Sequence, residues 1–132
     1  QPTHVKYALV PHKFRWDKSS ISKKSSSWNE PLIGVFSSDF DFENKSFIDL
    51  LSSGYELSSV QIMRDGILVR LFNSEGDGIA QKIKLCFPFK SIEEMELNGE
   101  MKNANNSIKA ILGNEIQLSI PRFGVRSFYI KN

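Results

Sequence analysis

The stretch "YELSSVQIMRDGILVRLFN", residues 55–73, consists of two apolar-rich runs separated by an Asp-Gly pair. In the second run, Ile67, Val69 and Leu71 alternate with side chains of the opposite face, which is the period of a β-strand. Asp65 and Gly66 between two such runs are a strong signal for a β-hairpin. The stretch therefore predicts two antiparallel strands joined by a tight turn.

The same pattern recurs along most of the chain, with turn signals at short intervals. Strands are expected within residues 4–10, 32–36, 55–63, 67–73, 79–87, 91–96, 107–112, 116–120 and 125–130, and residues 47–51 are a candidate for a further short strand. The segment "WDKSSISKKSSSWNEP" is polar and predicts a loop or a short helix that carries Ile21 and Trp28 inward. A chain of 132 residues is long enough for one packed core. We expect an all-β fold, an antiparallel β-sandwich of about eight or nine strands with at most one short helix, as one domain over residues 1–132.

Composition excludes several classes of function. The chain has 17 basic and 15 acidic residues, so its net charge of +2 does not favour nucleic acid or an anionic membrane as a partner. No apolar run approaches the length of a membrane span, and the first residues lack the pattern of a signal peptide. A single cysteine, Cys86, excludes an internal disulfide and is expected to be a small packed residue of a strand.

The stretch "NSEGDG", Asn73 to Gly78, begins like a calcium-binding loop. Such a loop needs an acidic residue at position twelve and a helix on each side. Position twelve is Lys84, and both flanks have strand patterns. We therefore expect no metal here but a second hairpin, with Gly76 and Gly78 supplying positive φ.

No set of catalytic side chains converges in the sequence. Asp39 and Asp41 would share one face of an extended segment, and paired carboxylates can carry out glycosidic chemistry, but a solvated pair in a polar loop is the favoured interpretation. Glu93, Glu94 and Glu96 have the same weak standing. Likewise, His4 and His12 are expected to be solvated or turn residues. No catalytic, cofactor-binding or metal-binding residue is therefore assigned.

Three aromatic side chains flank the polar segment: Phe14, Trp16 and Trp28. Indole faces can stack on sugar rings, but aromatic residues also fill the cores and interfaces of small sandwiches. Packing in the core or against a neighbouring domain is the favoured interpretation, and a sugar platform is the alternative. These three residues are the candidates for an interface or a sugar contact, and we expect them to lie in an exposed apolar patch.

The order of motifs resembles that of family 38 glycoside hydrolases, the zinc-dependent α-mannosidases. The stretch "HVKYALVPHKFRW" resembles the family pattern "H-x-F-x-Y-A-L-Y-P-H-x-G-x-W", and Asn29, Pro31 and Leu32 match its "N-x-P-L". The stretch "GILVRLFNSEG" looks like "G-x-I-L-R-L-Y-N-x-x-G", and "PRFGVRSFYI" is similar to the family's last strand "P-F-E-I-x-T-L-R-L". The chain departs from the family at Lys13 and Phe14, at Arg122 and at Gly124. The four matches lie in the family's order and span nearly the whole chain.

These motifs belong to the C-terminal β-sandwich of such enzymes, so the resemblance implies a C-terminal fragment of a larger enzyme. It implies a parent that hydrolyses α-mannosides with retention, using zinc and an aspartate nucleophile that lie in a preceding region. We expect this chain to be inactive alone, to hold no cofactor, and to pack on the catalytic and middle domains of the same polypeptide. The alternative is a carbohydrate-binding or interaction β-sandwich module without catalysis.

Overall fold

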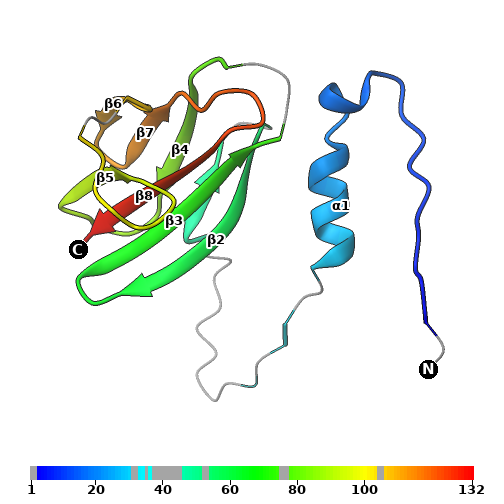
Figure 1. The fold of residues 1–132 in the computed structure, drawn as a ribbon, viewed down its shortest axis with the longest axis horizontal. Coiled ribbons are helices and arrows are strands. Elements are labelled where there is room, and N and C mark those ends of the chain that lie inside the picture. Colours follow the sequence, from blue (N-terminus) through cyan, green and yellow to red (C-terminus); the bar gives the residue numbers. More distant parts are fainter. Residues whose placement is uncertain are drawn as a thin grey trace.

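The structure is a computed structural model that describes residues 3–30, 33–34, 36, 46–51, 54–74, 78–103 and 106–132. Its described part contains eight strands, a short 3-10 helix η1 (Trp16–Lys18) and one α-helix, α1 (Ile21–Asn29). The strands are β1 (Ile48–Leu50), β2 (Tyr55–Met63), β3 (Gly66–Asn73), β4 (Gln81–Leu85), β5 (Ser91–Met95), β6 (Ile108–Leu112), β7 (Glu115–Leu118) and β8 (Val125–Lys131). The expected all-β class with one short helix is confirmed (Figure 1).

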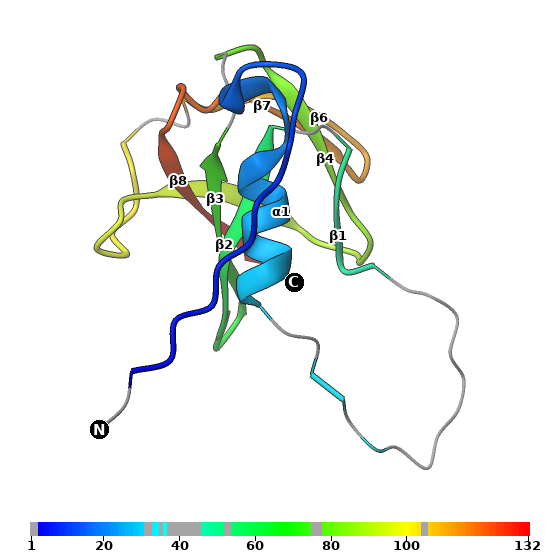
Figure 2. The ribbon, with the colours of Figure 1, turned by 90° about the vertical axis from the view of Figure 1, so that its right-hand side faces the viewer.

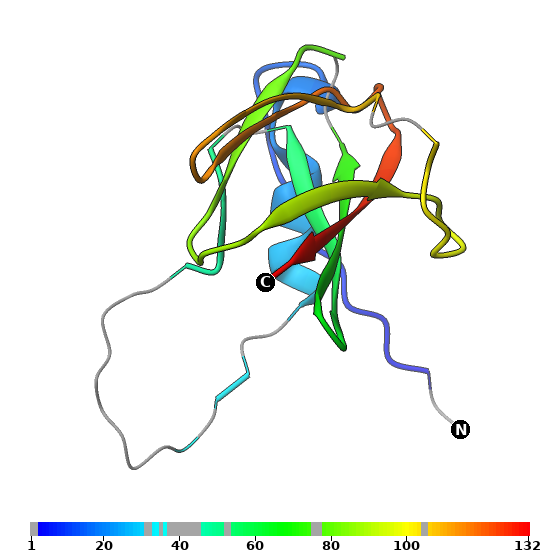
Figure 3. The same ribbon diagram turned by 90° about the vertical axis from the view of Figure 1, so that its left-hand side faces the viewer.

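The strands form two four-stranded antiparallel sheets, as expected for a sandwich. One sheet has the order β1-β4-β7-β6 and the other the order β2-β3-β8-β5. Figure 3 shows the two groups of strands from the side of β5 and β8. The predicted hairpin is confirmed, since Met63 pairs with Gly66 and the two residues between them make the turn. Turns are also present at Asn98–Gly99 and Gly113–Asn114, and both glycines have positive φ.

The core lies between the two sheets and follows the alternation of the sequence. Along β3, Ile67, Val69 and Leu71 are buried while the side chains between them are partly exposed. The buried apolar set is Tyr55, Ile67, Val69, Leu71, Ile83, Leu85, Ile92, Ile116, Leu118, Ile120, Phe128 and Ile130. Burial of each such side chain contributes about 1.5–3 kcal/mol before chain entropy is subtracted, so this set is the main stabilising feature of the sandwich.

The second predicted hairpin is wrong. β3 and β4 belong to different sheets, so they do not pair with each other as a hairpin. The physical reason is that β2 and β8 already occupy both edges of β3, which leaves no edge for β4. Gly78 does not have positive φ, and Gly76 lies outside the described residues.

The strand expected at residues 4–10 is also absent. Residues 3–12 are assigned to no strand and are exposed throughout, because no other described strand pairs with them. In the predicted strand 32–36, the described residues Ile33, Gly34 and Phe36 are likewise in no strand. The alternation of apolar side chains in these segments therefore indicates an extended backbone, but it does not show that the segment pairs in either sheet.

The polar segment forms the helix α1, but it does not carry Trp28 inward as expected. No residue of α1 is buried, and no side chain caps its first turn. A nine-residue helix without a packed face is marginal by itself. Figures 1 and 2 show α1 standing beside β2, with residues 3–12 running along its other side. Within the described residues, no helix is long and apolar enough to cross a membrane.

Candidate interface site

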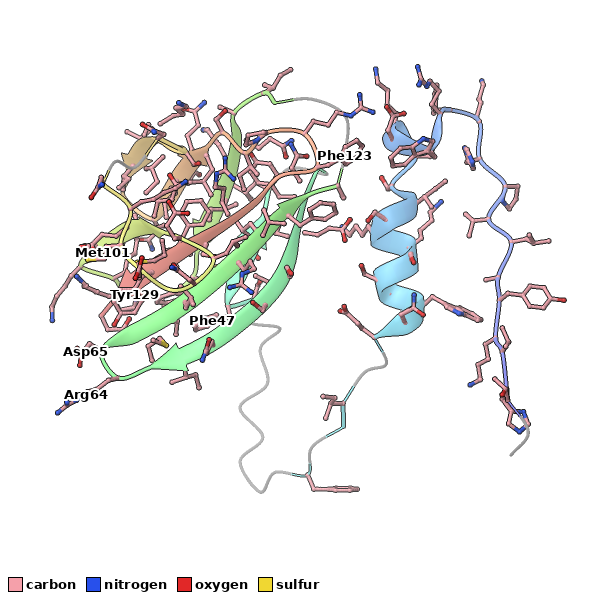
Figure 4. All side chains as sticks on the ribbon, viewed as in Figure 1. Phe47, Arg64, Asp65, Met101, Phe123 and Tyr129 are labelled. Carbon is pink, nitrogen blue, oxygen red and sulfur yellow. The ribbon has the colours of Figure 1, made fainter. Side chains whose placement is uncertain are left out.

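Trp16 joins the N-terminal segment to the sandwich by an aromatic contact. Its ring stacks on Phe123, with 5.5 Å between ring centroids and an interplanar angle of 13°. Phe123 lies in the connection between β7 and β8, at the edge of the sandwich that faces η1 and α1 (Figure 4). Both rings remain about half exposed. Offset stacking of this kind contributes about 0.5–1.5 kcal/mol beyond the area it buries.

An ion pair between neighbouring residues reinforces this stack. Arg122 Nη2 donates to Asp17 Oδ2 at 2.9 Å, and the Arg122 guanidinium lies 4.7 Å from the centroid of the Phe123 ring. Asp17 is buried, and Arg122 is the closer of its two charge partners, since Arg15 Nε lies 3.9 Å from the other carboxylate oxygen. We call Trp16, Asp17, Arg122 and Phe123 the clasp.

The loop that carries Arg122 and Phe123 is held in a strained form by Asn73. Phe123 has a φ of 56°, a left-handed conformation that is rare for a bulky residue. Its backbone N–H donates to the carbonyl of Asn73 at 3.0 Å, and the Asn73 side-chain amide donates to the carbonyl of Ile120 at 2.9 Å. A Cβ on Gly124 would lie 2.8 Å from the Pro121 carbonyl, so this loop requires glycine there.

The other two aromatic candidates do not join the clasp. Trp28 lies on α1, where it borders a hollow of about 420 Å³ with Ser20, Lys23, Lys24 and Ser27. Phe14 is exposed just before η1, within a turn that Ser19 holds by donating its hydroxyl to the Phe14 and Arg15 carbonyls. The structure thus brings Trp16 to the sandwich and leaves the side chains of Phe14 and Trp28 exposed.

A buried charge cluster lies on the sandwich itself, at Glu94. Its carboxylate accepts hydrogen bonds from Lys102 Nζ at 2.8 Å and from the Ser107 backbone and hydroxyl at 2.9 Å each. Arg126 Nε lies 3.3 Å from the same carboxylate. Burial alone would raise the pKa of Glu94, but the hydrogen bonds from Lys102 and Ser107 outweigh it and hold the pKa below its ordinary value. The sequence pattern placed Glu94 among solvated acids, and this was wrong because β5 turns it inward.

Cys86 is exposed, so the expectation of a packed residue is wrong. It follows the last residue of β4 on the same side as Lys84, whereas Ile83 and Leu85 point into the core. Partial desolvation, followed by the hydrogen bond to Asp49, raises the pKa of the Cys86 thiol. The neighbouring Ser46 and Cys86 lower the pKa of Asp49. A raised thiol pKa argues against a role as a nucleophile.

The remaining candidate residues are scattered or lie outside the described residues. Asp39 and Asp41 lie outside the described residues. His12 is exposed and contacts the Phe14 carbonyl and the Ser19 hydroxyl through Nδ1, which is a local turn contact. Across the described ranges, no three His, Cys, Asp or Glu side chains gather in a way that could hold a metal ion.

The clasp could not have been found by sequence pattern. Its two halves are 105 residues apart in the chain, and each half contains an aromatic residue next to a charged one. Such dipeptides are common, so only the fold pairs them. The one available signal was Arg122, which departs from the family pattern at the position where the clasp forms.

Comparison with known proteins gives no relative. No family model, no curated protein and no solved structure matches the chain.

Proposed function

We propose that this chain is a C-terminal accessory β-sandwich of a zinc-dependent, retaining α-mannosidase of the family 38 type. Its role is structural, since it packs on the domains that precede it and supports the substrate cleft there. The proposal rests on the four motifs in family order and on one structural observation. Val5, Tyr7 and Leu9, in the first of these motifs, are 77%, 83% and 89% exposed.

An exposed alternating segment of this kind favours a partner sheet. Extended backbone with apolar side chains is stabilised when its N–H and C=O groups pair with an adjacent strand. In the described part of the chain, no strand pairs with residues 3–12. A neighbouring domain of the same polypeptide would supply both the strand and the apolar cover. The clasp fits this role because it holds η1, the next element along the chain, against the sandwich.

The chemistry of the parent would lie outside this chain. Zinc in such an enzyme needs several acidic or histidine ligands with an open coordination position. The described residues offer no such group, so no residue here is assigned to zinc and no catalytic step is placed on this chain. We expect the isolated chain to have no mannosidase activity.

Co-expression with the polypeptide encoded upstream tests the proposal. We expect the two to copurify and the complex to hydrolyse 4-nitrophenyl α-mannoside, while the chain alone does not. Replacing Tyr7 and Leu9 by Ser should reduce recovery of the complex at least several-fold, because both side chains would lose their apolar cover. Leu112→Ser is the control, since Leu112 is also apolar and 68% exposed but lies on β6. Turnover by the purified chain, or equal recovery of both variants, would contradict the proposal.

A carbohydrate-binding module is the second candidate, and Trp28 favours it. The indole is 58% exposed and borders a hollow with serine hydroxyls and lysines, which suits stacking on a sugar ring. Titration with mannobiose should then quench indole fluorescence, and Trp28→Ala should abolish the response. Trp16→Ala serves as the comparison, because one face of Trp16 is already covered by Phe123. No response in the unchanged protein would remove this candidate.

A further inference from the structure

A second hollow, separate from the clasp, opens at one end of the sandwich. It has a volume of about 430 Å³ and is lined by Phe47, Ile67, Phe87, Phe89, Lys90 and Asn132, together with one proline. We call it the aromatic pocket. In Figure 4, Phe47 lies well away from Phe123 of the clasp. Neither the resemblance nor the proposed function uses this pocket.

The chain leaves this pocket open because of how it passes from β4 to β5. These strands belong to different sheets, so residues 86–90 must cross between the layers. Pro88 has no backbone N–H and cannot take part in a strand ladder. Phe87 and Phe89 on either side of it are half-buried and pack against the core. No described strand fills the space beside residues 86–90, and side chains line it instead.

Phe47 forms the outer wall of the pocket. Its ring stacks on Phe87 with 4.4 Å between centroids and an interplanar angle of 14°. Phe47 is nevertheless 51% exposed, so much of its surface stays in contact with solvent. Exposed aromatic surface next to a pocket of this size is typical of small-molecule sites, which are mostly apolar with few polar groups.

Lys90 is the one cation that borders the pocket, and its ammonium group is unpaired within the described residues. By contrast, the lysines at 82, 102 and 131 each have a carboxylate partner, at 3.2 Å, 2.8 Å and 3.1 Å respectively. Lys90 is exposed, and among the described residues only its backbone N–H is engaged, as a donor to the Lys131 carbonyl. An unpaired ammonium beside apolar walls favours a ligand with one negative charge.

We propose that the aromatic pocket binds small amphipathic carboxylates, with an aromatic or aliphatic body between Phe47, Phe87 and Ile67 and the carboxylate at Lys90. The Asn132 side-chain amide can donate a second hydrogen bond to the same group. A sugar fits this pocket poorly, because its hydroxyl groups would lose water without gaining enough partners from phenyl walls. The proposal is thus independent of whether the parent acts on mannosides.

Three probes with one body and different charges test the proposal: 4-phenylbutyrate, 4-phenylbutan-1-ol and 4-phenylbutylamine. Each is titrated into the ¹⁵N-labelled chain, and amide shifts are followed by NMR. We expect the butyrate to shift amides at Phe47, Ile67 and residues 87–90, with the alcohol binding more weakly and the amine most weakly. Lys90→Gln should weaken butyrate binding roughly 2- to 5-fold, as expected for a partly exposed ion pair. It should leave the affinity for the alcohol unchanged.

Two further variants complete the test. Phe47→Ala should weaken both the acid and the alcohol by about tenfold, because both lose the same stacking surface. Lys109→Gln, on β6 in a different part of the surface, should change nothing. The proposal is overturned if the butyrate causes no shifts at these amides. It is also overturned if acid, alcohol and amine bind equally, or if Lys90→Gln weakens all three alike.

Discussion

Strand β3 and residues 3–12 have the same alternation of apolar side chains, but the structure treats them in opposite ways. In β3, Ile67, Val69 and Leu71 are buried, whereas Val5, Tyr7 and Leu9 are exposed almost completely. The difference lies in the partners, since β3 pairs with β2 and β8 and has a second sheet against its inner face. Alternation therefore predicts which segments extend, and the availability of a partner decides which of them are buried.

The same contrast separates the sandwich from the whole N-terminal region, residues 3–30. The sandwich has its own core and a buried charge cluster, so it should fold by itself. The N-terminal region has a helix without buried residues and is joined to the sandwich mainly by the clasp and by a hydrogen bond from Ser26 to Glu56. Its stability should be low and local, as is common for segments that bind partners.

The largest effect is expected at Gly66, where the sandwich tolerates no side chain. A Cβ there would lie 2.0 Å from the carbonyl oxygen of Ile130, so Gly66→Ala must push β3 away from β8. We expect a loss of at least about 3 kcal/mol in the free energy of unfolding, measured by urea denaturation.

Gly78→Ala is the control for this change. A Cβ at Gly78 meets nothing within 4 Å, so its effect should stay within about 0.5 kcal/mol. Equal stability of the two variants would mean that β3 and β8 can separate without cost, and the close pairing described for them would be wrong.

The second effect concerns Glu94 and depends on pH. Glu94→Gln leaves Lys102 and Arg126 without their charge partner, but both are partly exposed, so we expect a loss of about 2 kcal/mol at neutral pH. The pKa of Glu94 is lowered in the folded state, so its contribution is fully present above the ordinary value of 4.5. It is lost as the pH falls through the lower, folded-state pKa.

Denaturation of both proteins across the acid range checks this prediction. The difference in stability between wild type and Glu94→Gln should shrink as the pH falls below 4.5. Glu115→Gln, which disrupts an exposed ion pair with Lys82, should cost less than about 1 kcal/mol. If the difference in unfolding free energy between wild type and Glu94→Gln did not change with pH, packing and not charge would account for the stability of the cluster.

The sequence predicted the eight strands of the two sheets because strand formation follows the local alternation of side chains. The hairpin at Arg64 and Asp65 and the inward face of β3 both follow from period-2 alternation and one turn signal. The alternation of Ile83 and Leu85 with Lys84 also predicts that Cys86 lies on the exposed side of the strand, as the structure shows.

The failures arose where distant segments decide the outcome. The segment after Asn73 resembled a hairpin, but one edge of β3 pairs with β2 and the other with β8, which lies far along the chain. Glu94 looked solvated until Lys102, Ser107 and Arg126 were brought around it. The clasp depends in the same way on two dipeptides that only the fold brings together.

A smaller effect should show that the N-terminal region can open while the sandwich stays folded. Asp17→Asn and Arg122→Gln, alone and combined, form a double-mutant cycle on the ion pair of the clasp. We expect a coupling of about 0.5–1 kcal/mol in the free energy of local opening of α1, since Arg122 is partly exposed. Amide hydrogen exchange of residues 21–29 measures this opening. The midpoint of global urea unfolding should change little, and a fall in that midpoint with unchanged exchange in α1 would contradict the distinction between the two regions.

The smallest effect concerns the left-handed backbone of Phe123. Alanine normally stabilises a chain more than glycine does, because glycine has more freedom when unfolded. At a φ of 56° the preference should reverse, since a Cβ costs roughly 1–2 kcal/mol in this conformation. Phe123→Ala and Phe123→Gly lose the same ring, so their difference reports the backbone alone, and we expect the glycine variant to be more stable by about 0.5–1 kcal/mol. The same two substitutions at Phe14, whose φ is not positive, provide the control and should show no preference for glycine. An alanine variant at Phe123 as stable as the glycine variant would mean that Asn73 does not hold the loop in its strained form, and the geometry of the clasp would then need another cause.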